Sequence, residues 1–210
     1  MDEEKPADNM MAEQAFHPSE RTHESDDQLV AALAAHEPAA WRNLFEEQYD
    51  RVYRYAYLRT GNAADADDVA STTFVEAVRG IGRYQHRGTP VAAWLFRIAH
   101  NETVDLLKRR SRRLTATRDH PDAAVIAAPD DIAAADNRRE VAEALGALKH
   151  AHRDVLMLRL VEGHSVADTA RILGKTEGAI KVTQMRALQT VRKALNIDRK
   201  IRDTHTGDTP

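Results

Sequence analysis

Apolar side chains recur along most of the chain at steps of three and four residues, the spacing of one face of an α-helix. This pattern predicts helices over residues 26–37, 39–59, 62–80 and 91–110. It returns over residues 138–148, 153–161, 165–173 and 176–195. Because no stretch alternates apolar and polar residues as a half-buried strand would, the sequence predicts an all-α fold.

Residues 111–135 interrupt this pattern with two prolines, Pro121 and Pro129, and several aspartates. Compact domains seldom contain a structureless connection of this length. We therefore predict two small helical domains, residues 26–112 and 136–195, joined by a flexible linker over residues 113–135. The polar, acidic residues 1–25 are predicted to be a disordered tail, and residues 196–210 form a second tail.

Charge is distributed unevenly along the 210 residues, although 30 Lys and Arg against 33 Asp and Glu leave a net charge of only −3. Residues 81–118 contain 9 basic and 2 acidic side chains, and residues 148–193 contain 9 and 4. Phosphate binding depends on local rather than net charge, so these two blocks are candidate nucleic-acid surfaces. Solvated helix faces would account for the same blocks, and charge alone does not decide between the two.

Several classes of protein are excluded by what the sequence lacks. The chain has no Cys, which excludes a disulfide framework, a Cys-ligated zinc site and a Cys nucleophile. No apolar run approaches the ~18–20 residues that span a bilayer, and no signal peptide precedes the helices. We therefore expect a cytoplasmic protein without membrane insertion.

No catalytic motif is present either. Gly174-Lys175-Thr176 resembles the end of a phosphate-binding loop, but Thr169 stands where that loop requires glycine. His150 and His152 could contact a metal, but a solvated pair of histidines is the favoured interpretation. We expect no enzyme activity, no metal and no cofactor.

Residues 166–185 have the spacing of a helix-turn-helix, the strongest local signal in the chain. Ala170 is small enough for close helix packing, Gly174 suits a sharp turn with positive φ, and Ile180 can be buried against the first helix. Ser165 and Thr176 stand where caps are needed. An ordinary helical hairpin remains the alternative. In a helix-turn-helix, the second helix faces the major groove of DNA, here with Thr176, Glu177, Gly178, Lys181, Val182, Met185 and Arg186.

Two longer segments resemble a known family. Residues 44–110 include D-A-D-D-V-A-x-x-T-F (residues 65–74) and A-W-L-F-R-I-A-x-N (residues 93–101). They are similar to region 2 of the sigma-70 family of bacterial RNA polymerase sigma factors, specifically its extracytoplasmic-function (ECF) group. Residues 142–195 resemble region 4 of that group. The resemblance implies two helical domains, one reading the −10 and the other the −35 promoter element.

The resemblance also implies roles for individual residues. The helix over residues 62–80 would bind core RNA polymerase through Asp65, Asp67, Asp68, Val69 and Phe74, although the two apolar side chains could equally belong to the core. The −10 element would be read, with a flipped base, by Tyr84, Arg87, Gly88, Asn101, Lys108 and Arg109. Trp94 is expected in the core rather than as a stacking platform. The −35 element would be read by the helix-turn-helix.

The sequence also departs from the family pattern at several positions. Ser71-Thr72 replaces a frequent Gln-Glu, and Lys175 replaces a hydrophobic residue. The family often has Arg two positions after the lysine of the recognition helix, but here Val182 and Thr183 follow Lys181. Lys149 replaces a frequent Pro. These departures leave the polymerase contacts and the −35 sequence preference open.

The resulting hypothesis is an ECF sigma factor whose partners are core RNA polymerase, promoter DNA and an anti-sigma protein. A stand-alone helix-turn-helix regulator is the alternative, although no dimerisation helix is visible. A helical interaction protein would not need Arg97, the basic residues 108–110, Lys181 or Arg186.

Overall fold

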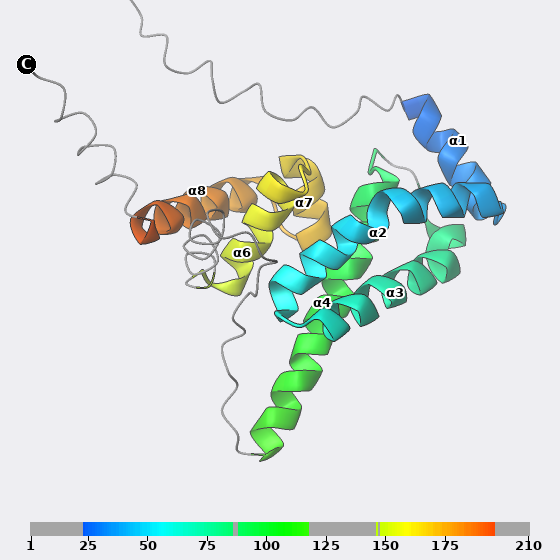
Figure 1. Ribbon diagram of the computed structural model, residues 1–210. Helices are drawn as coiled ribbons and strands as arrows, with labels where there is room; N and C mark the ends of the chain where they lie inside the picture. The colour runs from blue at the N-terminus through cyan, green and yellow to red at the C-terminus, as the bar shows by residue number, and fades with distance from the viewer. Residues whose placement is uncertain (1–22, 86–87, 118–145, 147, 196–210) are drawn as a thin grey trace, which may run out of the picture.

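The computed structural model describes residues 23–85, 88–117, 146 and 148–195. The helices in this part of the chain are α1 (His23–Ala34), α2 (Pro38–Thr60), α3 (Ala63–Gly80), η1 (Ile81–Arg83), α4 (Val91–Thr117), α6 (His150–Leu156), η2 (Met157–Val161), α7 (Val166–Leu173) and α8 (Glu177–Ala194). No strand occurs among these residues, which confirms the predicted all-α class (Figure 1). None of the described helices is long and apolar enough to cross a membrane.

Several helix ends lie where the local sequence predicts them. Gly61 adopts a left-handed conformation at the end of α2, with φ of 65°. The side chains of Asn62, Ser165 and Thr176 accept hydrogen bonds from backbone N–H groups in the first turns of α3, α7 and α8. These bonds satisfy donors that a helix start leaves without a partner, so residues close in sequence fix the boundaries.

Two helices differ from the sequence prediction, and a third predicted helix lies largely outside the described residues. The fourth helix continues to Thr117 instead of ending at Arg110, and so enters the segment predicted as linker. The helix predicted over residues 153–161 is an α-helix only to Leu156 and then a π-turn, η2. The helix predicted over 138–148 falls largely outside the described residues, as do most of the linker, residues 1–22 and residues 196–210. The tail predicted over residues 1–25 is too long by three residues, because α1 begins at His23.

The N-terminal domain is built from α1 to α4. Leu33, Leu44, Phe74 and Leu95 are all buried in its core. The Trp41 indole N–H donates a hydrogen bond of 3.1 Å to the carbonyl oxygen of Leu33, which ties α1 to α2. The helices α2, α3 and α4 pack on one another, and α3 also contacts η1.

The C-terminal domain has the helix-turn-helix that the spacing predicts. Ala170 of α7 and Ile180 of α8 are 6% and 0% exposed and pack together with Val155 of α6. Gly174 makes the turn between the helices with φ of 61°. A small residue, a left-handed turn and a buried β-branched residue therefore occupy the positions that this motif requires.

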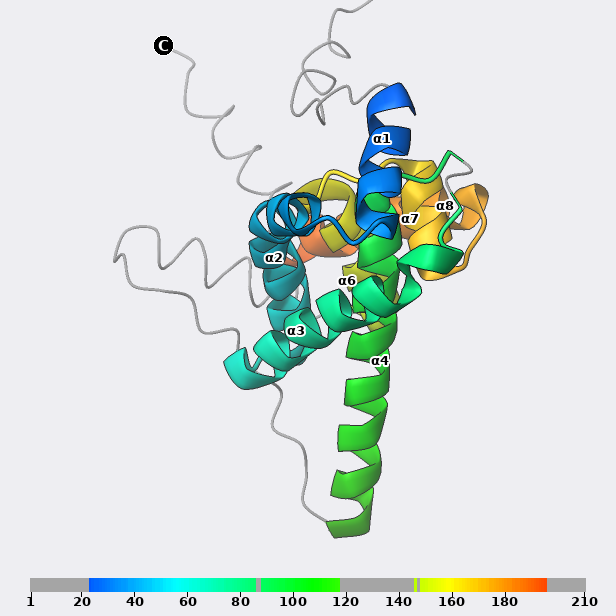
Figure 2. The same cartoon turned by 90° about the vertical axis from the view of Figure 1, so that its right-hand side faces the viewer.

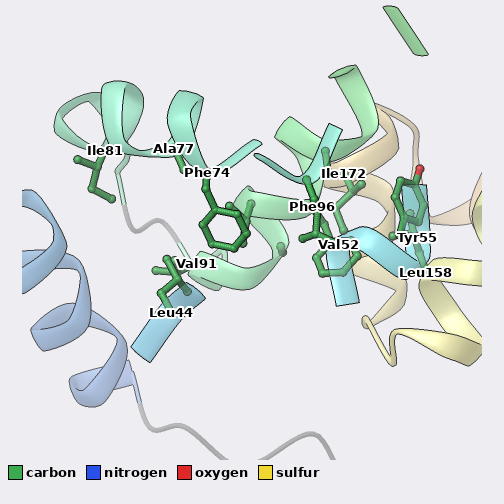
Figure 3. Close-up of a cluster of buried hydrophobic side chains, with 14 of the residues drawn as sticks. Leu44, Val52, Tyr55, Phe74, Ala77, Ile81, Val91, Phe96, Leu158 and Ile172 are labelled. Atoms are coloured by element: carbon green, nitrogen blue, oxygen red, sulfur yellow. The ribbon is translucent and has the colours of Figure 1, made fainter. Parts of the chain in front are cut away.

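The two domains pack against each other and share one continuous hydrophobic core. Leu158 and Ile172 of the C-terminal domain lie in the same cluster as Val52, Tyr55 and Phe96 of the N-terminal domain. Figure 3 shows these five side chains gathered together, apart from the group around Phe74 and Ile81. The structure is thus a closed arrangement in which α7 lies along α4 (Figures 1 and 2).

The two glycines of the helix-turn-helix should respond oppositely to alanine. No atom lies within 4 Å of a Cβ added at Gly174 or Gly178, so backbone conformation decides both outcomes. Gly174→Ala should lower the free energy of unfolding by ~1–2 kcal/mol because of its positive φ. Gly178→Ala, in helical backbone, should raise it by ~0.4–1 kcal/mol. Denaturant unfolding measures both, and equal effects would contradict the assigned turn.

Candidate functional site

The outward face of α8 gathers all seven residues predicted to contact the −35 element. Thr176, Glu177, Gly178, Lys181 and Arg186 are exposed, and Val182 and Met185 are 44% and 53% exposed. Two cations and two apolar side chains therefore share one accessible helix face. This combination can contact phosphates and the methyl-bearing edges of bases in a major groove.

A cavity of about 290 Å³ opens between the end of α3, η1 and α4. Its lining residues are Glu76, Gly80, Arg83, Tyr84, Trp94, Ile98, Asn101 and Glu102. Two of them, Tyr84 and Asn101, were predicted as −10 contacts. Polar side chains, a cation and two aromatic rings are the groups that a cavity for an unstacked base requires.

Two aromatic rings shape this cavity. The ring centroids of Tyr84 and Trp94 lie 4.9 Å apart, and the Tyr84 hydroxyl donates a hydrogen bond to the carbonyl oxygen of Thr89. Burial, reinforced by the negative charges of Asp26, Asp27 and Asp168, raises the pKa of Tyr84 to about 12. Tyr84 is therefore a neutral donor that ties the end of η1 to Thr89.

Trp94 has a double role that the sequence did not predict. It packs against the core while also lining the cavity. Trp94 is therefore a core residue, as expected, and also part of the cavity wall.

Among the remaining −10 residues that the structure describes, Gly88, Lys108 and Arg109 do not line the cavity. Gly88 turns the loop with φ of 67°, and Arg87 lies outside the described residues. Lys108 and Arg109 are exposed further along α4, about two helical turns beyond Asn101. Figure 2 shows this part of α4 extending beyond the helical bundle. The cavity and the basic end of α4 therefore lie one after the other along α4 as candidate contacts for the −10 element.

The candidate polymerase surface divides into exposed carboxylates and buried apolar residues. Asp67 and Asp68 are exposed on α3, and Asp65 pairs with Arg110 at 3.2 Å. Val69 and Phe74 are only 2% and 7% exposed. These two side chains belong to the core, so in this conformation they present no docking surface.

Exposed apolar residues lie next to these carboxylates. Phe45, Val75 and Val78 are 45%, 47% and 41% exposed. The ring of Phe45 lies 4.6 Å from that of Tyr49, whose hydroxyl donates to Asp67. The sequence places all three apolar residues on amphipathic helices, but the pattern does not reveal that they remain uncovered. We call the set Phe45, Tyr49, Asp67, Asp68, Val75 and Val78 the α2–α3 face.

Two histidines lie where the domains meet, His164 buried and His100 partly buried. The His164 ring contacts Phe96 edge to face at 4.6 Å, and His100 Nδ1 lies 2.9 Å from the Tyr55 hydroxyl. Burial, helped by nearby arginines, lowers the pKa of each histidine from 6.5 to about 4. Both rings are therefore neutral at pH 7.

Comparison with known proteins agrees with this architecture. Residues 44–113 match the family model for Sigma-70 region 2, and residues 138–191 match that for Sigma-70, region 4. The fold and the exposed α8 face thus define a two-domain, DNA-binding helix-turn-helix protein. The chain belongs to the ECF RNA polymerase sigma factors, a family of transcription initiation factors, as the following relatives establish.

The chain is 37% identical over 174 residues to the ECF RNA polymerase sigma factor BldN of Streptomyces coelicolor, covering 81% of this chain and 66% of BldN. It is 34% identical over 169 residues to SigL of Mycobacterium tuberculosis, covering 79% of this chain and 94% of SigL. Among solved structures, CnrH in complex with the cytosolic domain of CnrY matches with a TM-score of 0.63 and 26% identity. That match covers 82% of this chain and 98% of the CnrH chain.

Acid should weaken the folded arrangement through the two histidines. Each pKa is lower in the folded than in the unfolded protein, so unfolding takes up protons as pH falls below 6.5. The free energy of unfolding should fall by ~1.4 kcal/mol per pH unit for each histidine between pH 6 and 4.5. Denaturant unfolding across this range measures the slope.

The variant His164→Gln provides the control, since it removes one titrating ring. It should remove the contribution of His164 to the slope, while His100 and His150, whose pKa burial also lowers, keep theirs. Burial raises the pKa of Asp154, and this carboxyl group therefore opposes the histidines at lower pH. An unchanged slope in His164→Gln would contradict the assignment.

Proposed function

We propose that this chain binds core RNA polymerase in the cytoplasm, directs it to promoters with matching −10 and −35 elements and helps to melt them. The observation that carries this proposal is the presence of two separate candidate DNA surfaces, the α8 face and the cavity beside α4, on one sigma-family chain. The chain contributes binding rather than catalysis, and polymerase performs the chemistry. One surface alone would suffice for a stand-alone regulator.

The α8 face is suited to reading duplex DNA. Lys181 and Arg186 supply positive charge near the start and middle of the helix, where a recognition helix meets the groove. Val182 and Met185, both exposed, would contact base edges. Few phosphates are within reach of so short a face, so we expect weak binding until polymerase supplies further contacts.

The cavity is suited to a single base taken out of the stack. Its volume, its two aromatic rings and its polar rim support the recognition of an unpaired −10 base. The basic end of α4, with Lys108 and Arg109, would hold the adjoining backbone. Capturing a base in this way favours the melted state of the promoter, because paired DNA cannot fill the cavity.

The α2–α3 face is the surface that we assign to polymerase. It combines exposed apolar side chains with carboxylates, a composition suited to a basic, partly apolar helical partner. A further partner is an inhibitory anti-sigma protein. The solved complex of CnrH with the cytosolic domain of CnrY supports this, since this chain resembles CnrH over most of its length.

Lys181→Ala and Asp68→Ala should each weaken a different binding step, the first variant promoter recognition and the second polymerase binding. Lys181→Ala should weaken promoter use roughly tenfold, the loss of ~1–2 kcal/mol of DNA contact, without changing polymerase affinity. Asp68→Ala should weaken polymerase affinity about fivefold. Size-exclusion co-elution and titration with core polymerase measure polymerase affinity. Promoter-specific transcription, with polymerase at saturating concentration, measures promoter use.

Exposed residues of the same type provide matched controls. Lys193→Ala changes a lysine in the last turn of α8, and Glu37→Ala changes an exposed carboxylate that precedes α2. Neither should alter either step. If Lys181→Ala behaved like Lys193→Ala in transcription, α8 would not be the recognition helix.

Asn101→Ala should impair melting at the −10 element. Removing one hydrogen-bonding side chain from the cavity should cost about 1 kcal/mol, or roughly fivefold in the yield of open complexes. Permanganate reactivity of unpaired thymines in the polymerase complex measures that yield. Asn43→Ala, at an exposed asparagine of α2, should leave it unchanged. Equal yields for both variants would refute the role of the cavity.

A further inference from the structure

All the sulfur atoms of this chain belong to methionines, since the sequence has five Met and no Cys. Met157 and Met185 lie in the part of the chain that the structure describes. Met157 is 1% exposed and belongs to the core, whereas Met185 on α8 is 53% exposed. A thioether is oxidised where an oxidant can reach it. Of these two methionines, Met185 is therefore the one open to oxidation.

Helix geometry directs the Met185 side chain away from the domain. α8 packs inward through Ile180 and Ala187, which are both 0% exposed. Because each residue advances ~100° around the helix axis, Met185 lies ~140° from Ile180 and ~160° from Ala187. It shares a row on the outward side with Gly178 and Val182, which stand at helical spacing before it. Met185 therefore lies in the middle of the α8 face proposed to read duplex DNA.

Gly178 leaves the start of this row without a side chain. No atom lies within 4 Å of a Cβ added there, so packing within the domain does not require glycine. Its absence of a side chain lets the first turns of α8 approach DNA closely, as the N-terminal part of a recognition helix does. A close approach brings Val182 and Met185 toward the edges of the bases.

The Met185 thioether is an apolar group beside free positive charge. Together with Leu188, Gln189 and Arg192 it lines a cavity of about 400 Å³ on α8. Lys181, one helical turn before Met185, is exposed and has no ion-pair partner among the described residues. An oxygen atom added to the sulfur would be a hydrogen-bond acceptor within reach of the Lys181 ammonium group.

We propose that Met185 is a reversible oxidation site that controls the reading of duplex DNA by α8. A peroxide transfers one oxygen atom to the sulfur: the O–O bond breaks, an S–O bond forms, the sulfur loses two electrons, and hydrogen peroxide leaves as water. A thiol-dependent methionine sulfoxide reductase restores the thioether, while two thiols become a disulfide and the oxygen leaves as water. The effect on DNA rests on the proposed function, which assigns α8 to the −35 element.

The sulfoxide would weaken DNA binding in two ways. A polar sulfoxide loses hydrogen bonds with water when an apolar group such as a thymine methyl covers it, whereas a thioether loses none. The sulfoxide oxygen would also compete with DNA phosphate for Lys181. Both effects act at α8, so the cavity beside α4 and the α2–α3 face keep their properties.

Peroxide treatment of the full chain tests this site. Hydrogen peroxide is the oxidant, and peptide mass mapping measures the oxidised fraction of Met157 and Met185 separately. The probe is a DNA duplex selected from a randomised pool by the chain with core polymerase, or by the free chain if no complex forms. Oxidation of Met185 should weaken duplex binding roughly tenfold, the cost of losing one base contact. Methionine sulfoxide reductases for both sulfoxide epimers, with dithiothreitol, should restore it.

Matched variants separate Met185 from other effects of peroxide. Met185→Leu removes the sulfur but keeps an apolar side chain of similar volume. Its duplex affinity should be the same before and after peroxide, since each protein is compared with itself. Met185→Gln should bind more weakly without peroxide, because its amide is permanently polar. Leu160→Gln makes a similar change at a side chain that is 57% exposed outside α8, and it should leave duplex affinity unchanged. Met157 should stay unoxidised while circular dichroism reports a folded chain.

The possible results are distinct. A tenfold loss in the unmutated chain that Met185→Leu does not show would support the site. An equal loss in both proteins would overturn it, and so would full oxidation of Met185 without loss of affinity, or protection of Met185 from peroxide. If the chain did not bind core polymerase but lost duplex affinity on oxidation, the oxidation site would stand and the proposed function would fail. Absence of duplex binding both with and without polymerase would overturn both.

Discussion

Tyr55 and Phe96 pack edge to face where the two domains meet, with ring centroids 5.8 Å apart and no exposure of either residue. Both belong to the N-terminal domain, but Leu158 and Ile172 of the other domain complete the cluster around them. Burial of such rings is among the largest contributions that a side chain makes to packing. The closed arrangement therefore depends on apolar surface that each domain alone would leave partly in water.

The ion pairs at this interface, which join Arg51 and Arg54 to Glu162 and Arg59 to Asp154, have a different role from the apolar contacts. Replacing a buried ion pair by apolar residues often leaves stability unchanged, whereas removing one partner is costly. Arg51, Arg54 and Arg59 thus specify one orientation of the C-terminal domain more than they add affinity. In this arrangement the α8 face and the α2–α3 face stay accessible.

Local features of the structure were predictable from sequence, and features that join distant segments were not. Asn62, Ser165 and Thr176 cap helices because their partners lie three residues away. In contrast, Val69 and Phe74 could be core or surface, since an amphipathic pattern does not show which residues a neighbour covers. The cavity combines residues of α3, η1 and α4, and Glu162 meets Arg51 from 111 positions away. Neither arrangement produces a periodic pattern in the amino-acid sequence.

The π-turn η2 is a local irregularity that affects a contact between distant segments of the chain. The Glu162 N–H donates to the carbonyl oxygen of Met157, five residues back, at 2.9 Å. A π-turn accommodates one more residue than an α-helical turn and so shifts the following side chains by ~100° around the axis. Met157 and Leu158 enter the core, while Leu160 and Val161 are exposed. Because Glu162 follows directly, the irregular turn sets the direction from which its carboxylate approaches α2. The departure from a regular helix is therefore part of what positions the interface.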